Sequence, residues 1–198
     1  MPSSLKLIVG LGNPGSEYTE TRHNAGFWFL DRLAAIHRTS FISDRKAHGD
    51  TARATLEGVD CRLLKPQTYM NNSGRAVQAV CDYYAIKPDE ILVVHDEIDL
   101  DSGVIRLKQG GGHGGHNGLR DIIEQTGDNS FLRLRIGVGH PGHSSQVHDY
   151  VLQRPSAEDR KKLDEAIVAA LEMMPLVCSG QLNKAMSLLH TVKPNKLD

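Results

Sequence analysis

Leu5-Lys6-Leu7-Ile8-Val9-Gly10-Leu11 is an apolar run that leads into Gly12-Asn13-Pro14-Gly15, and apolar residues then recur with helical spacing from Asn24 to Ile36. A short apolar run, a polar loop and an amphipathic stretch are typical of a buried strand followed by a helix. This alternation continues along the chain and predicts an α/β fold. Strands are expected at Leu5–Leu11, Thr51–Leu56, Arg62–Leu64, Ile91–Val94, Val104–Leu107 and Leu132–Val138, and helices at Asn24–Ile36, Gly74–Tyr84, Leu119–Gln125, Ala157–Met173 (ended by Pro175) and Leu182–Leu189.

A hairpin and the chain length refine this prediction. Gly58 separates two of the expected strands, Thr51–Leu56 and Arg62–Leu64, which indicates an antiparallel pair. The expected fold is therefore a twisted mixed β-sheet flanked by helices. The 198 residues allow a single domain, 1–198, with a polar and frayed tail at 191–198.

Composition excludes several classes of protein. The formal net charge of −1 gives no bulk attraction to nucleic acid, so a polyanion site must be a local basic patch. Cys61, Cys81 and Cys178 lack CxxC spacing, which disfavours a disulfide framework and a thiolate metal site and fits a reducing cytoplasm. The apolar run Leu5–Leu11 is too short for a secretion signal or a membrane span.

A GxGxxG pattern at Gly10–Gly15 does not predict a dinucleotide site. The same pattern recurs from Gly110 and from Gly137, and the expected helix does not begin at Gly15. Two of the copies follow apolar strands, which suggests that both strands end at one rim of the sheet. In open α/β sheets ligands bind at the carboxyl ends of the strands, where Asn13 and His95-Asp96 are also expected.

Six of the nine residues from Gly110 to Gly118 are glycine, and the others are His113, His116 and Asn117. Glycine contributes no buried side chain, so such density favours close backbone approach to a ligand. The alternative is a flexible linker, although linkers more often carry serine and charge. Helical spacing from Leu119 predicts that the loop opens onto a helix N-terminus, which favours anions.

Five longer motifs follow one another along the chain. They are Tyr18-Thr19-Glu20-Thr21-Arg22-His23-Asn24-Ala25-Gly26, Pro66-Gln67-Thr68-Tyr69-Met70-Asn71-Asn72-Ser73-Gly74, His95-Asp96-Glu97-Ile98-Asp99-Leu100, Gly110–Leu119 and Phe131–Gly142. In this order they resemble the motifs of bacterial-type peptidyl-tRNA hydrolases, and the resemblance extends over most of the chain, from Leu7 to about Met186. The sequence departs from the family pattern at Asp101-Ser102-Gly103 and at Arg154-Pro155, where local loop geometry can differ.

The resemblance implies an enzyme that hydrolyses the ester between a peptide, or an N-blocked amino acid, and tRNA. Free peptide and reusable tRNA are released in the cytoplasm, without metal or cofactor. The implied partner is peptidyl-tRNA, through its acceptor stem and CCA end, and the enzyme is expected to be a monomer with no membrane contact.

An ester hydrolase needs a nucleophile, a proton acceptor and donors for the oxyanion. The sequence contains no GxSxG elbow and no recognisable nucleophilic cysteine, so an activated water is the expected attacker. His23 matches the general base, and Asp96 is expected to hold its other ring nitrogen. The substrate-binding residues that the resemblance implies are Asn13, Tyr18, Met70, Asn71, His116 and Asn117.

Structural roles for the same residues stay open from the sequence alone. His23 could be a helix-start residue bonded to backbone, Asp96 a turn former, and Asn13 and Asn71 turn or capping residues. The spacing of His113 and His116, like that of His140 and His143, raises zinc as an alternative, but histidines in glycine loops commonly bond to backbone or ligand, and no metal is expected.

The expected phosphate site lies around the glycine loop. Lys108 and Arg135 resemble the family's clamp for the tRNA 5′-phosphate, and Arg133 and Arg135 alternate along one strand, which puts both on one face. Arg106 and Arg120 fit solvated surface charge equally well. The resemblance also implies a mobile cover formed by Gly139–Val147 and the helix that begins at Ala157.

Three other classes of protein remain to be distinguished. A non-catalytic RNA-binding homologue would keep the basic patch and the glycines without needing His23, Asp96 and Asn13. A metallohydrolase would lose activity in chelator, and a nucleotide-dependent oxidoreductase would bind a dinucleotide.

Overall fold

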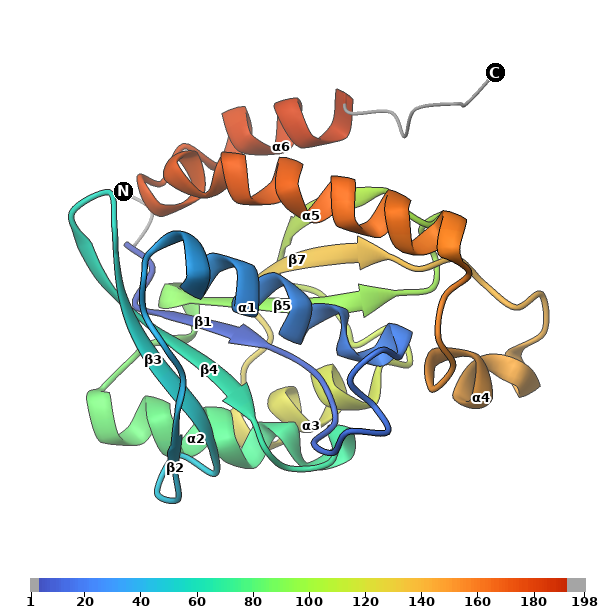
Figure 1. Ribbon diagram of the computed structural model, residues 1–198. Coiled ribbons are helices and arrows are strands. Elements are labelled where there is room, and N and C mark those ends of the chain that lie inside the picture. The colour runs from blue at the N-terminus through green and yellow to red at the C-terminus, as the bar shows by residue number, and fades with distance from the viewer. Residues whose placement is uncertain (1–3, 192–198) are drawn as a thin grey trace.

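A seven-stranded mixed sheet forms the centre of the protein in the computed structural model, which describes residues 4–191 (Figure 1). The strand order is β2-β3-β4-β1-β5-β7-β6, with β1 parallel to β4 and β5, β5 parallel to β7, and the remaining pairs antiparallel. The strands are β1 (Leu7–Gly10), β2 (Ile42–Asp44), β3 (Gly49–Leu56), β4 (Val59–Pro66), β5 (Ile91–Glu97), β6 (Ile105–Gln109) and β7 (Leu132–Gly137), and the helices are α1 (Ala25–Ile36), α2 (Ser73–Tyr84), α3 (Asn117–Thr126), α4 (Val147–Val151), α5 (Ala157–Cys178) and α6 (Leu182–Thr191).

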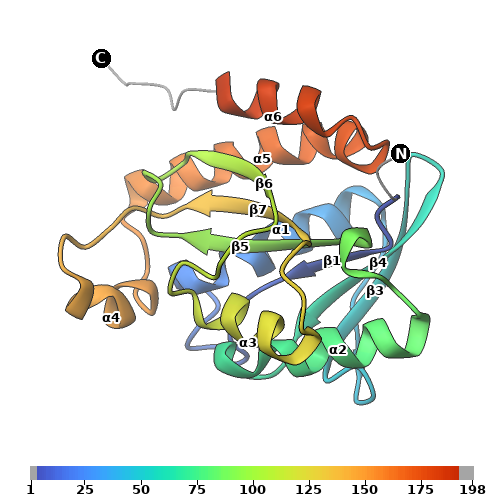
Figure 2. The same cartoon turned by 180° about the vertical axis from the view of Figure 1, so that it is seen from behind.

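Helices cover both faces of the sheet. Figure 2 shows α1, α5 and α6 on one face and α2 and α3 on the other, and an apolar core fills each side. Strand β1 contributes to both cores, since Ile8 faces one and Leu7 and Val9 face the other. The predicted α/β class with a mixed, helix-flanked sheet is therefore confirmed.

Two short elements were not predicted, and one predicted helix end is wrong. Strand β2 and helix α4 are too short to carry a clear apolar period. Helix α5 continues through Pro175 to Cys178, whereas the sequence predicted that the proline ends it. Met174, Val177 and Cys178 are buried in the core, and this packing keeps the last turn helical despite the missing N–H. The predicted tail lies outside the described residues, apart from Thr191.

Close backbone contact between α1 and β1 fixes the start of α1. A Cβ atom on Gly10 would lie 2.4 Å from the carbonyl oxygen of Gly26, and one on Gly26 would lie 2.4 Å from both Leu11 N and Val94 O. Only glycine at both positions allows the helix to approach the strands this closely. The short 3₁₀ turn Arg22–Asn24, immediately before α1, is thereby held at the carboxyl ends of β1 and β5.

Candidate active site

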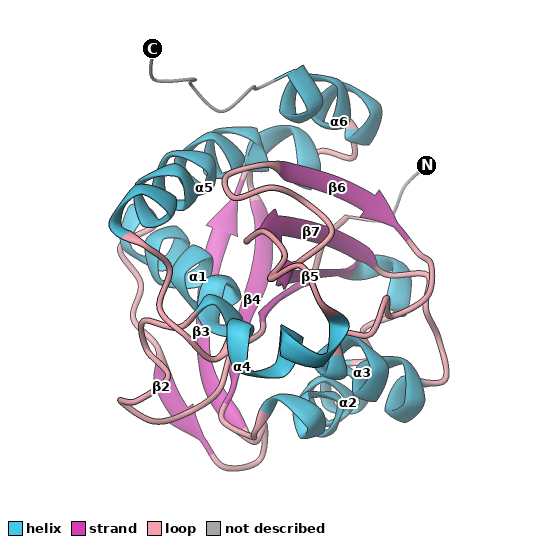
Figure 3. Ribbon diagram, turned by 90° about the vertical axis from the view of Figure 1, so that its right-hand side faces the viewer, coloured by secondary structure: helices cyan, strands magenta, loops and turns pink. Residues whose placement is uncertain are grey.

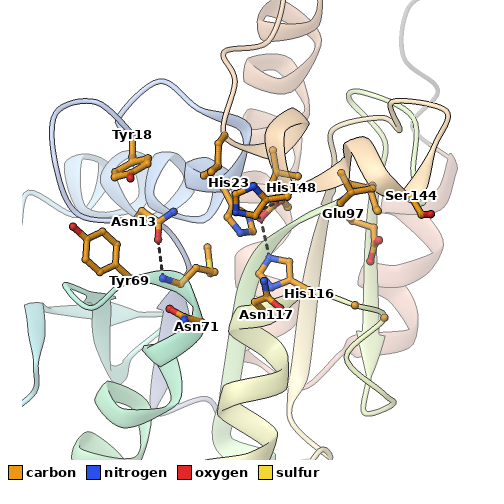
Figure 4. Close-up of a pocket in the computed structure, with 18 of the residues that line it drawn as sticks. Asn13, Tyr18, His23, Tyr69, Asn71, Glu97, His116, Asn117, Ser144 and His148 are labelled. Carbon is orange, nitrogen blue, oxygen red and sulfur yellow. Dashed lines mark hydrogen bonds and ion pairs between the residues drawn. The ribbon is translucent and has the colours of Figure 1, made fainter.

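Helix α4 lies across the end of the sheet from which the loops after β4 and β5 leave (Figure 3). A cavity of about 850 Å³ opens there, at the carboxyl ends of β1, β4 and β5 (Figure 4). Loops that follow these strands form one side, the glycine loop before α3 forms another, and α4 closes a third. All eight residues predicted for catalysis and substrate binding lie on its wall. The lining residues are Asn13, Tyr18, His23, Tyr69, Met70, Asn71, Asn72, Asp96, Glu97, Ile98, Gly114, Gly115, His116, Asn117, His140, Ser144, Val147, His148, Val151 and Leu152.

Asp96 joins two imidazoles at the base of this cavity. Its carboxylate lies 2.9 and 3.0 Å from Nδ1 of His23 and 2.9 Å from Nε2 of His116, and the residue is 2 % exposed. Burial by itself raises the pKa of this carboxyl, but the attraction and hydrogen bonds of the two imidazoles outweigh burial and hold the pKa well below its usual range. Asp96 is therefore an anion that accepts hydrogen bonds from both rings.

The hydrogen-bond partners assign a tautomer to each imidazole. His116 caps helix α3, since its Nδ1 accepts from the backbone N–H groups of Gly118 and Leu119, so the ring proton lies on Nε2 and points at Asp96. His23 donates from Nδ1 to the same carboxylate. Within residues 4–191 no group hydrogen-bonds to Nε2 of His23, which is left to accept a proton from a ligand in the cavity.

His23, Asp96 and His116 could also be considered as metal ligands. Each offers a ligand atom, and these atoms lie within 4.8 Å of one another. A metal at this point would replace the two ring protons that face Asp96, and His116 would then have to give up its cap on α3 or become an imidazolate. The arrangement is better suited to protons than to a metal ion. The histidine pairs that raised zinc as an alternative bond to nearby backbone instead. Nδ1 of His113 accepts from Gly115 N, and Nδ1 of His140 accepts from Gly142 N.

Asn13 and Asn71 differ in the hydrogen bonds that they make within the protein. The Oδ1 atom of Asn13 accepts the backbone N–H of Met70 at 2.7 Å, and the Asn13 backbone exchanges two hydrogen bonds with the side chain of Asn24. Asn13 is therefore a structural link between two loops that are distant in sequence, and its Nδ2 group is the part left for a ligand. Asn71 is exposed at the rim and makes no comparable bond within the described chain.

The predicted basic residues lie outside the cavity, on β6 and β7. Lys108 is exposed, while Arg135 is partly exposed and donates to Glu97 at 3.0 Å. Arg133 and Arg135 share one face of β7, as their alternation predicted. Across the strand pair, Arg135 lies opposite Arg106 and Arg133 lies opposite Lys108. Glu97 also lines the cavity, so Arg135 connects the basic surface to the site.

Two arginines near the site have roles that the sequence did not predict: Arg133 was expected in the basic patch, and Arg22 was not singled out. Arg133 is 2 % exposed and donates to the carbonyls of Gly111 and Gly112, which holds the glycine loop against the sheet. Arg22, beside His23, contacts the end of α4. The expected cover is partly wrong, because α4 and the preceding turn line the cavity, whereas no residue of α5 does.

Comparison with known proteins identifies the family. A family model described as peptidyl-tRNA hydrolase matches residues 7–196. Proteins named peptidyl-tRNA hydrolase from Neisseria gonorrhoeae and Pseudomonas fluorescens are 52 % and 54 % identical to the chain, each over 96 % of it and over 100 % and 99 % of their own length.

Solved structures agree with these sequence matches. The crystal structure of a peptidyl-tRNA hydrolase from Acinetobacter baumannii has a TM-score of 0.95 and 50 % identity, with 98 % of this chain and 99 % of that chain covered. The fold and the site define an α/β enzyme of the hydrolase class. The chain belongs to the peptidyl-tRNA hydrolase family. No helix among residues 4–191 is long and apolar enough to cross a membrane.

Proposed function

We propose that this chain hydrolyses the ester between a peptide, or an N-blocked amino acid, and the terminal ribose of tRNA. The observation that carries the proposal is the His23–Asp96 pair, which leaves Nε2 of His23 open to the cavity. Family membership supplies the substrate class. The family resemblance implies a monomer, and the substrate implies action in the cytoplasm.

His23 acts as the general base. Its Nε2 removes a proton from a water molecule as the water oxygen attacks the ester carbonyl, and Asp96 stabilises the imidazolium that forms. The same proton then passes to the ribose oxygen as the ester bond breaks, so free peptide and tRNA leave with the base restored. The three cysteines are poor alternative nucleophiles, since burial raises the pKa of all of them, to about 11 for Cys81 and Cys178.

The amides and aromatic residues hold the substrate. Asn71, Asn117 and the free Nδ2 group of Asn13 offer donors that do not titrate, which suits the ester carbonyl and the developing oxyanion. Tyr18, Met70 and His116 complete the wall against which the CCA end and the peptide residue esterified to it would lie. We expect the reaction to need no metal, since an imidazole base and amide donors can supply its proton transfers and hydrogen bonds.

Incubation with an N-acetylaminoacyl-tRNA labelled in the amino acid tests the function directly. We expect release of the labelled N-acetylamino acid at the same rate with and without EDTA, because the base is an imidazole. Binding of tRNA without release would support the non-catalytic homologue instead. Loss of release in EDTA, restored by added divalent ion, would support a metallohydrolase.

Lys108 and Arg135 are proposed to bind the tRNA 5′-phosphate. Lys108→Ala should raise KM for the tRNA substrate while largely sparing kcat, and should make the fall in affinity with salt shallower, since fewer counterions are released. Arg135→Ala should act in the same direction. The measurement is KM across a salt series, with Lys46→Ala as a control, since Lys46 is an exposed lysine near the opposite edge strand, β2.

A short substrate separates a phosphate contact from a chemical role. An N-acetylaminoacyl-adenosine ester has no tRNA body, so Lys108→Ala should leave its hydrolysis unchanged. An equal loss on both substrates, or a salt slope unchanged in both variants, would place the phosphate elsewhere.

A further inference from the structure

Arg22 lies in a buried position between the proposed base and the helix that closes the cavity. Its Nη1 atom lies 3.1, 3.3 and 3.2 Å from the carbonyl oxygens of Tyr150, Gln153 and Arg154. Its backbone N–H donates to Gln153 O at 3.1 Å, and its guanidinium lies 3.9 Å from the centre of the Tyr150 ring. One side chain thus binds three carbonyls of a five-residue stretch, 128 to 132 residues away in sequence.

Tyr150 lies in the last turn of α4, and Gln153 and Arg154 follow the helix. The last carbonyls of a helix lack a full set of partners inside it, and Tyr150 O also accepts the backbone N–H of Gln153 at 3.2 Å. Nη1 carries two N–H groups for three acceptors, so at least one hydrogen bond is shared, and the positive charge strengthens each of them. The same end of α4 is bound a second time, since the Tyr150 hydroxyl donates to Val138 O at 2.7 Å. Because all three contacts of Arg22 are to backbone, the unusual Arg154-Pro155 pair does not disturb them.

The segment that carries Arg22 and His23 is also bound to α1 and α5. The indole N–H of Trp28 donates to Thr19 O at 2.8 Å, and Glu20 forms an ion pair with Arg160 of α5 at 2.8 Å. Arg22 is 7 % exposed, so its charge has been removed from water and depends on these partners. A change of the Arg22 side chain therefore loosens the end of α4, which keeps the Tyr150 hydroxyl bond and the backbone bond from Arg22 N to Gln153 O, while the other anchors of the base segment stay in place.

We propose that Arg22 is a positioning residue that fixes α4 over the cavity and keeps this wall in register with Nε2 of His23. Through α4 it places Val147, His148 and Val151 against the part of the substrate nearest the ester. The inference rests on the proposed function. It predicts an effect on the chemical step that is independent of the tRNA body.

Arg22→Met tests the proposal, because it keeps an unbranched apolar stem and removes the guanidinium. We expect kcat/KM to fall about 10- to 100-fold, in line with the cost of misplacing a substrate-contacting wall. The loss should be equal for N-acetylaminoacyl-tRNA and for the N-acetylaminoacyl-adenosine ester, with an unchanged salt slope. Arg22→Lys should recover most of the activity, since an ammonium group still offers three donors to the same carbonyls.

Arg32→Met is the matched control, because Arg32 also crosses to another helix, by bonding to Asp164, but touches no residue of the cavity wall. Its kcat/KM should equal that of wild type. Hydrogen exchange in Arg22→Met should rise at 147–153 and stay unchanged in the central strands. Wild-type activity in Arg22→Met, or exchange that rises equally throughout the sheet, would overturn the proposal. An inactive wild type would refute the proposed function instead.

Discussion

Replacing His23 with alanine is expected to lower kcat at least ~10²-fold, the usual contribution of a general base, while substrate binding persists. The physical reason is that Nε2 is the ring nitrogen that faces the cavity, and alanine leaves no group there to accept the proton of water. Single-turnover hydrolysis of N-acetylaminoacyl-tRNA measures the effect. His37→Ala, at an exposed histidine just after α1, is the control and should keep full activity.

Asp96→Asn should cost less than His23→Ala, and the double variant should be little slower than His23→Ala. The two residues act as a unit, because Asp96 contributes to turnover through the orientation and charge of His23. An amide cannot accept with both atoms, so one of the two imidazoles loses its acceptor. Additive losses, or wild-type turnover by His23→Ala, would end the proposal that this pair activates water.

Gly26→Ala should lower the free energy of unfolding by about 3 kcal/mol or more, because the added methyl group meets backbone atoms on two sides. A side chain can rotate away from a clash, whereas Leu11 N and Val94 O, each 2.4 Å from the new Cβ, cannot. For a chain of this size the melting temperature should fall by roughly 6–12 °C. Thermal unfolding measures this, and kcat should fall as well, since α1 must shift and the turn that carries His23 moves with it.

Gly58→Ala provides the comparison for this experiment. Gly58 has a φ of 77° in the β3–β4 turn, but a Cβ there would meet nothing within 4 Å. The cost is then only the backbone strain of a positive φ, about 1 kcal/mol, with kcat unchanged. Equal losses of stability in the two variants would show that the close approach of α1 to the sheet is not what Gly26 provides.

Most of the fold was predictable because apolar periodicity is a local property. The strands and longer helices lie where that period indicated, with ends that differ by a few residues. Pro175 shows where local reasoning fails, since the last turn of α5 is held by the burial of Met174 and Val177 in a core that the rest of the chain supplies. The low helix propensity of proline is outweighed by packing against residues that are distant in sequence.

The candidate site was likewise predictable only in part. His23 and Asp96 were found because they lie in long motifs, and strand ends in an α/β sheet meet at one rim. Arg22 and Arg133 also lie in these motifs, but the sequence did not indicate what they bind, because their partners are backbone carbonyls, which any residue possesses. The alternation of Arg133 and Arg135 placed both on one face, but which of them would be buried depends on the path of the glycine loop.

The size of the cavity has a consequence for the range of molecules that this chain can process. A volume of about 850 Å³ is that of a site for a drug-sized ligand. We expect the terminal nucleoside and the amino acid esterified to it to occupy this space, and the remainder of a long peptide to extend beyond it. Few contacts would then distinguish one peptide sequence from another. We therefore expect broad acceptance of peptidyl-tRNAs that differ in the length and composition of the peptide.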